Sequence, residues 1–304
     1  MPEIDIIING LYKNASIFLN DAIVHLNKSA DSYSDKLLAV IDIQIALELA
    51  IKVRIAQDYG ITAILEQIDS ETSIDELIQK YTSNALRAKE FEATKNFLKS
   101  QKTYNQIFTD EYVYMDRFQR YRNKLIHFNY NFSEAELIAI ESDIIHIIVY
   151  IIHSLLSSDL SAEEYREFIF EIIKSSEYSK LLRNPKFYNE LKNLIVREYN
   201  ESYYCPLCDR KLLTPIKKCL GCLVDFGDEI AFGFVKCQYC GKETVVFDAL
   251  NLPDNKMLRG LCVNCGEDTF VYRCEVCGKV YNWERFDATE CRPGYCATFD
   301  ESVQ

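Results

Sequence analysis

Apolar residues at helical spacing dominate the first two hundred positions of the chain. One stripe runs through residues 4–26 and a second through residues 37–51. Side chains three and four positions apart share one face of a helix, so each stripe predicts an amphipathic helix. The same spacing predicts further helices at 77–99, 110–129, 133–157, 161–176 and 185–199. Long helices with short connections favour an antiparallel helical bundle.

Polar residues mark the starts of two of these helices. Ser34 and Asp35 precede the second stripe and can cap it, because their side chains accept hydrogen bonds from exposed backbone N–H groups. Ser73 is followed three residues later by Glu76, which is the spacing of a capping box. We therefore expect helices to begin just after residues 34 and 73.

The composition changes near residue 200. All twelve cysteines lie at or after Cys205, and only two of the ten glycines, Gly10 and Gly60, come before residue 200. Glycine favours turns, so the first part is predicted to be helical and the second to be rich in turns and short strands. We place the domains at 1–200 and 201–304, the second built of small β-rich modules.

The cysteines form six close pairs, five of them with two residues between the partners. The pairs are Cys205/Cys208, Cys219/Cys222, Cys237/Cys240, Cys262/Cys265, Cys274/Cys277 and, with four residues between, Cys291/Cys296. A two-residue gap lets one tight turn direct both sulfurs at a single metal ion, and two turns complete a tetrahedral site. Gly241, Gly266 and Gly278 each follow a second cysteine, where glycine tolerates a positive φ.

Neighbouring pairs, taken in order, give three sites of four cysteines, which is the arrangement of zinc ribbons. Interleaved pairing uses the same twelve ligands and stays open. A disulfide scaffold is disfavoured because the N-terminus carries no secretory signal. Iron–sulfur clusters also use four thiolates. Strand-like segments between the pairs, at 244–247 and 270–272, favour zinc instead. Four protein ligands leave no open position, so three structural zinc ions are predicted.

The charge of the chain limits the kinds of partner it can have. The formal net charge is -12, and the acidity is spread over both parts, which excludes a wholly basic surface for nucleic acid. A local cluster of basic residues is formed by Arg117, Arg120, Arg122 and Lys124. No uncharged apolar stretch is long enough to span a membrane. We expect a cytoplasmic protein that does not enter a membrane.

One histidine follows this basic cluster closely. Arg122 and Asn123 are separated from His127 by Lys124, Leu125 and Ile126. This stretch resembles the signature of HEPN-domain ribonucleases, in which an arginine and a polar residue are followed by a histidine after a gap of four to six. The HEPN family also has a Glu and a Lys four apart on an earlier helix, and Glu48 and Lys52 are similar. The resemblance covers residues 1–160 and does not reach the cysteines.

The resemblance implies a metal-independent endoribonuclease with Arg122, Asn123, His127 and Glu48 at its active site. Cleavage requires deprotonation of the 2′-hydroxyl, protonation of the leaving 5′-oxygen and stabilisation of charge on phosphorus. Histidine can transfer the protons, and arginine can hold phosphate oxygens. Arg122 and His127 lie about 140° apart around a regular helix. Family members bring two copies of the motif together, so a homodimer is expected.

Three functional hypotheses follow. The first is a ribonuclease that acts as a toxin or antiphage defence effector, whose zinc ribbons bind the RNA substrate or a regulator such as an antitoxin. The second is a HEPN domain that binds without cleaving. The third is a zinc-ribbon adaptor, in which Tyr203, Tyr204, Tyr239 and Trp283 stack on bases or pack small cores.

Overall fold

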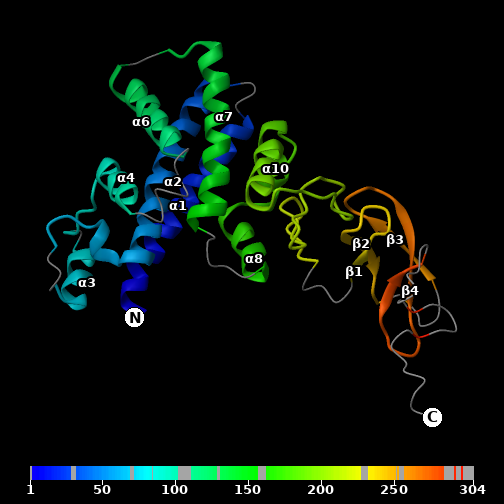
Figure 1. Cartoon of the computed structure of the whole chain (residues 1–304). Helices are drawn as coiled ribbons and strands as arrows, with labels where there is room; N and C mark the ends of the chain where they lie inside the picture. The colour runs from blue at the N-terminus through cyan, green and yellow to red at the C-terminus, as the bar shows by residue number, and fades with distance from the viewer. Residues whose placement is uncertain are drawn as a thin grey trace. The chain divides into compact units, whose positions relative to one another are not determined.

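The computed structural model divides into two compact units, residues 1–190 and 191–304, and the division falls within the helix Pro185–Tyr199. The sequence analysis placed the boundary at residue 200. The structure describes residues 2–28, 32–68, 72–83, 85–101, 111–128, 131–156, 162–226, 232–250, 252, 257–283, 291 and 296. The side chains of residues 2–5, 127, 128 and 162–166 lie outside this description. Figure 1 shows the helices of the first part and the strands of the second.

The first two hundred residues are helical. Their elements are α1 (Pro2–Lys28), α2 (Tyr33–Tyr59), η1 (Ile61–Ile64), α3 (Ile74–Thr82), α4 (Phe91–Ser100), α6 (Glu111–Phe128), α7 (Glu134–Tyr150), η2 (Ile151–Leu156), α8 (Ala162–Ile172), α9 (Ser175–Leu181) and α10 (Pro185–Tyr199). Every helix among the described residues is too short or too polar to cross a lipid bilayer.

Helix α2 forms the centre of the first unit. Twelve of its residues, between Ala39 and Ala56, are buried, because its sequence is apolar on almost every side. It packs against α1 along most of its length and also against α4, α6, α7 and η2. Burial of these aliphatic side chains is the main force that holds the helices together. Figure 1 shows α1 and α2 side by side, with α7 next to them.

The predicted helix at 77–99 is wrong, since the chain forms two helices there, α3 and α4. The segment between them returns to η1 and pairs with it through the backbone. Lys89 donates its N–H to the carbonyl of Ile64, and Glu66 donates to the carbonyl of Arg87, both at 2.8 Å. Periodicity along the chain cannot reveal this pairing, because the two paired segments lie far apart in sequence.

The other predicted helices are present with changes at their ends. The predicted helix 133–157 is α7 followed by the π-helical turn η2, and 161–176 is divided between α8 and α9. Helix α2 is capped by Ser32, whose Oγ accepts from the N–H of Asp35. Ser73 caps α3 as expected, and the reciprocal capping box lies at Ser133 and Glu136, before α7.

A five-stranded antiparallel sheet organises the second unit. The strands β1 (Phe232–Lys236), β2 (Glu243–Asp248), β3 (Met257–Cys262), β4 (Asp268–Arg273) and β5 (Val280–Asn282) pair in chain order. The predicted strand segments at 244–247 and 270–272 lie within β2 and β4. One face of the sheet carries a small buried core that includes Val235, Val245, Phe247, Cys262 and Val271. The structure therefore has helices followed by a β-rich module.

Candidate metal centres and the helix α6 motif

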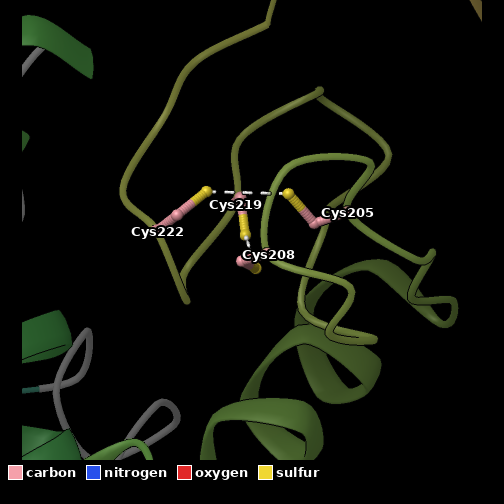
Figure 2. Close-up of side chains that lie close together, drawn as sticks. All are labelled: Cys205, Cys208, Cys219 and Cys222. Atoms are coloured by element: carbon pink, nitrogen blue, oxygen red, sulfur yellow. Dashed lines mark hydrogen bonds between the residues drawn. The ribbon is translucent and has the colours of Figure 1, made fainter. Parts of the chain in front are cut away.

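The twelve cysteines gather into three groups, each of which could hold a metal ion. The groups are Cys205, Cys208, Cys219 and Cys222; Cys237, Cys240, Cys262 and Cys265; and Cys274, Cys277, Cys291 and Cys296. Within each group all four sulfurs lie within 4.8 Å of one another. Figure 2 shows the sulfurs of the first group turned toward a common centre. Neighbouring pairs combine in chain order, and the interleaved arrangement is not adopted.

The distances between the sulfurs fit a tetrahedral metal site. Cys205 and Cys222 are 3.6 Å apart, and Cys208 and Cys219 are 3.7 Å apart. In the other two groups, the Sγ–Sγ distances of Cys237–Cys265, Cys240–Cys262, Cys277–Cys291 and Cys291–Cys296 lie between 3.5 and 3.8 Å. Four sulfurs at about 2.3 Å from zinc have edges of about 3.8 Å. A disulfide bond is about 2.05 Å long, so these thiols are free.

Five turns with the same backbone geometry deliver ten of the cysteines. In each turn the N–H of the first cysteine donates to the carbonyl five residues later, as from Cys237 to Lys242 at 2.7 Å. The residue after the second cysteine donates back to the first, as from Gly241 to Cys237 at 2.8 Å. That residue has a positive φ in all five turns. The expectation for Gly241, Gly266 and Gly278 is confirmed, with φ values of 73°, 78° and 70°.

Two turns reach this conformation without glycine. Asp209 follows Cys208 with a φ of 53°, and Leu223 follows Cys222 with a φ of 62°. Both belong to the first group of cysteines. A side chain at positive φ costs energy, so the other bonds of this module must hold the backbone there. In the sequence, a glycine after the second cysteine marks a turn with positive φ, and these two positions have no glycine.

Hydroxyl and amide groups surround the sulfurs. The Thr244 hydroxyl lies 3.2 Å from Cys262 Sγ and 3.7 Å from Cys240 Sγ. The N–H of Gly221 donates to Cys219 Sγ at 3.3 Å, and the Tyr281 hydroxyl lies 3.5 Å from Cys291 Sγ. A donor such as the Gly221 N–H stabilises negative charge on a thiolate and orients it toward a metal. Each group is thus a closed set of four sulfur ligands, with no position left for a substrate.

In the second group one thiol, Cys240, is favoured as a thiolate, whereas burial raises the pKa of Cys237 to about 12 and that of Cys265 above its usual value. Burial alone would raise the pKa of Cys240. The backbone N–H of Lys242 and the side chains of Asn264, Thr244 and Cys262 outweigh burial and lower that pKa to about 6. Metal ions bind the deprotonated sulfur, so this environment assists metal binding at neutral pH.

The sequence motif lies in the C-terminal half of α6. This helix begins at Glu111, eleven residues before Arg122, so the motif is not at a helix start. Arg122 is exposed and Asn123 is half-buried. Neither forms a hydrogen bond or ion pair within the described part of the chain. The backbone of His127 belongs to α6, but its side chain lies outside the described residues.

The basic residues that flank Arg122 are held by carboxylates of α7. Arg117 Nη1 donates to Asp143 Oδ1 at 2.8 Å, and Lys124 Nζ donates to Glu136 Oε1 at 3.2 Å. The Tyr121 hydroxyl also donates to Asp143, at 2.8 Å. These bonds fix the rotation of α6 against α7. As a result, Arg122 remains at the surface, able to meet an anion from outside the unit.

Glu48 is placed on the neighbouring helix but is not joined to the motif. Its Oε1 accepts from Lys52 Nζ at 2.7 Å, within α2, and no bond among the described atoms connects it to Arg122. Lys52 is buried whereas Glu48 is half-exposed. Helices α2 and α6 pack together, so Glu48 belongs to the same unit as the motif. The structure gives Glu48 the role of neutralising a buried ammonium group.

The remaining three histidines have structural surroundings. His25 Nδ1 lies 2.7 Å from Asp35, and the His146 ring stacks on Tyr114 with centroids 3.8 Å apart. His153, in η2, is held in an environment that lowers its pKa to about 3 through burial. All three are therefore packed or hydrogen-bonded within the first unit.

Of the four aromatic residues proposed to stack on bases, the structure supports two as surface groups. Tyr204 and Tyr239 are 47% and 52% exposed. Tyr203 is 7% exposed, which fits the alternative that it packs in a small core. Trp283 packs against Tyr272 and the cysteines of the third group. The first two can contact a partner, whereas the other two belong to small cores.

The chain was compared with models of protein families, with curated proteins and with solved structures, and none of the three comparisons found a match.

Proposed function

We propose that this protein is a metal-independent endoribonuclease of the HEPN type. The observation that carries the proposal is the exposure of Arg122 on α6. Its flanking cations Arg117 and Lys124 are held by α7, while Arg122 is exposed and Asn123 half-buried beside it, both without a partner in the described part of the chain. An unpaired guanidinium beside a histidine position is suited to bind a phosphodiester. The all-helical first unit supports the same assignment.

In this proposal Arg122 holds the phosphate oxygens and stabilises the negative charge that develops on phosphorus. His127 removes the proton from the 2′-hydroxyl or donates one to the leaving 5′-oxygen. Asn123 orients the imidazole or the phosphate. The products are a 2′,3′-cyclic phosphate and a 5′-hydroxyl. Glu48 acts through Lys52, as part of the support for α6 and not as a group that touches RNA.

The regular course of α6 supports a site made by two copies of the chain. Positions 122 and 127 lie about 140° apart around the helix axis, so one chain does not readily direct both side chains at one phosphate. A homodimer brings Arg122 of one copy to His127 of the other. Ile126, which is 50% exposed within the motif, supplies apolar surface for such a contact.

The three cysteine groups are proposed to bind structural zinc. Each offers four thiolates in tetrahedral arrangement and lacks histidine or carboxylate ligands, which is typical of structural zinc. Zinc would supply the second unit with cross-links that its small core cannot replace. That unit is proposed to bind RNA or a regulatory protein. Together these parts fit a toxin or defence effector.

Cleavage of RNA without magnesium tests the proposed activity. The purified full chain is incubated with total RNA in buffer that lacks divalent cations, and the product ends are mapped. We expect 2′,3′-cyclic phosphate ends from the parent and a loss of 10²-fold or more in His127→Ala, which is the usual contribution of a general acid or base. Arg122→Ala should lose at least as much, while the exposed control Arg183→Ala should cleave normally. Equal cleavage by His127→Ala and parent would favour the non-catalytic binding module instead.

A further inference from the structure

A second pair of basic residues lies beside the motif, between α4 and α6. Arg120, like Arg122, is exposed and forms no ion pair within the described residues. Lys99, on α4, is half-buried, and its Nζ lies 5.0 Å from the centroid of the Tyr112 ring. The positive charges of both residues act on the carboxylate of Asp116 and lower its pKa.

The two acids of this region, Glu92 and Asp116, share one buried ammonium group, which balances one of their two charges. Lys95 is 3% exposed, and its Nζ donates to Glu92 and to Asp116, both at 2.6 Å, and to Gln119 at 3.2 Å. A buried ammonium group is stable only with such partners. The bonds also tie α4 to α6. Asp116 Oδ1 therefore accepts from Lys95, so Asp116 already has an ion-pair partner other than Lys99 and Arg120.

Electrostatic evidence supports a positive surplus here. Burial would raise the pKa of Asp116, yet the pKa is lowered. The hydrogen bond from Lys95 and the positive charges of Lys95, Lys99 and Arg120 outweigh burial. Three cations thus act on this carboxylate, and among Lys95, Lys99, Arg120, Asp116 and Glu92 one positive charge is in excess. The chain as a whole has a net charge of -12, so this surplus is a local feature.

Arg120 is aligned with the histidine position of the motif along α6. Arg120 lies seven residues before position 127, which is two turns of helix. The two positions are therefore on the same side of α6, about 10 Å apart along its axis. Figure 1 shows α4 close to the N-terminal end of α6, away from the connection to α7. A strand of RNA that passes the motif and continues toward α4 would meet Lys99 and Arg120.

We propose that Lys99 and Arg120 form a binding subsite for a backbone phosphate of single-stranded RNA next to the cleaved bond. This inference rests on the proposed ribonuclease function and extends it by naming where the substrate continues. Lysine and arginine contact phosphates without reading bases, so the subsite contributes affinity and register but no sequence preference. Lys95 and Asp116 keep the two cations in place.

The test measures binding of a fluorescein-labelled 2′-O-methyl RNA, which has no free 2′-hydroxyl and cannot be cleaved by this route. Anisotropy titrations of the full chain are repeated over a range of KCl concentrations. Each phosphate contact contributes about 0.7 to the slope of log K against log salt for a single strand. Because both cations contact one phosphate, we expect Lys99→Gln and Arg120→Gln each to reduce the slope by part of this amount, and the double variant by about 0.7.

Two matched variants, Lys80→Gln on α3 and Arg183→Gln, remove one charge elsewhere in the same unit and should leave the slope unchanged. Circular dichroism checks that each variant is folded. With cleavable RNA, the subsite variants should raise KM and keep kcat. Unchanged slopes in folded Lys99→Gln and Arg120→Gln, or no binding of the RNA by the parent, would overturn the subsite. The ribonuclease proposal is judged separately, by cleavage in His127→Ala, because that change leaves the phosphate contacts in place.

Discussion

Arg117 and Asp143 form the ion pair that links the motif helix α6 to α7, with Nη1 and Oδ1 2.8 Å apart. The carboxylate of Asp143 is 5% exposed and the guanidinium of Arg117 is 35% exposed. The second oxygen of Asp143 accepts from the Tyr121 hydroxyl. One buried carboxylate thus sets the rotation of α6, and with it the direction in which Arg122 leaves the surface.

Replacing Asp143 with alanine should destabilise the first unit. The change leaves Arg117 and Tyr121 without their acceptor. Because Asp143 is buried and Arg117 is partly exposed, this costs about 2–3 kcal/mol of unfolding free energy. The control is Glu76→Gln in the exposed pair with Lys80, which should cost less than about 0.5 kcal/mol. Urea unfolding followed by circular dichroism measures both. Equal effects of the two changes would show that Asp143 does not anchor α6.

Alanine at Gly241 should cost about 1 kcal/mol through backbone strain alone. Its φ is 73°, and a Cβ built there meets no atom within 4 Å. Alanine at Gly233 is the contrasting case, because its Cβ would overlap the ring of Phe247 and should cost several kcal/mol. Thermal unfolding of the metal-loaded chain separates the two. A Gly241→Ala variant as stable as the parent would mean that positive φ is not required in this turn.

Metal removal should unfold the second unit and spare the helices of the first. Trp283 is the only tryptophan, and it packs against the cysteines of the third group. Loss of metal should therefore shift its fluorescence to longer wavelength, while the helical signal in far-ultraviolet circular dichroism stays. Elemental analysis should find about three zinc ions per chain before chelation. An unchanged tryptophan spectrum after complete metal loss would show that this group folds without metal.

Periodicity and spacing predicted the parts of the structure that depend on neighbours in sequence. The helix at 185–199 has the predicted bounds, and α6 covers residues 111–128 of the predicted 110–129, whose two end residues lie outside the described part of the chain. The two-residue gaps between cysteines indicated the turns, because such a turn is closed by its own backbone bonds. The motif of Arg122, Asn123 and His127 is also local in sequence, and its catalytic role stays a prediction.

Tertiary contacts decide the features that the sequence did not reveal. The return of the chain after α3 depends on bonds to Ile64 and Glu66, which no local pattern records. Asp209 and Leu223 hold a positive φ because the first metal module constrains them. The spacing of Glu48 and Lys52 allows their ion pair, but the burial of the Lys52 ammonium group depends on the packing around α2. Only the structure shows that the α7 carboxylates bind Arg117 and Lys124 and leave Arg122 without an ion pair in the described part of the chain.

Stability of the first unit should fall as the pH drops below about 6.5, with His153 as a contributor. Burial lowers the pKa of His153 from 6.5 to about 3 in the folded chain. Between these two values the unfolded chain binds a proton that the folded chain does not, so stability is lost as the pH falls through this window. The loss is at most about 1.4 kcal/mol per pH unit. His153→Leu should flatten this dependence in urea unfolding at pH 7 and pH 5. The same slope in the variant and the parent would exclude His153 as its source.

Mixing two inactive variants should restore RNA cleavage if the site combines residues of two chains. Arg122→Ala retains His127, and His127→Ala retains Arg122. In a mixed dimer one of the two composite sites then has both groups intact. With random exchange, half of the dimers are mixed, so about a quarter of the parent activity should return. The two variants are denatured together and refolded with zinc to allow exchange, and light scattering checks that dimers form. Recovery limited to the sum of the separately refolded variants would place Arg122 and His127 of each working site on one chain, since a site within one chain lacks one group in every combination.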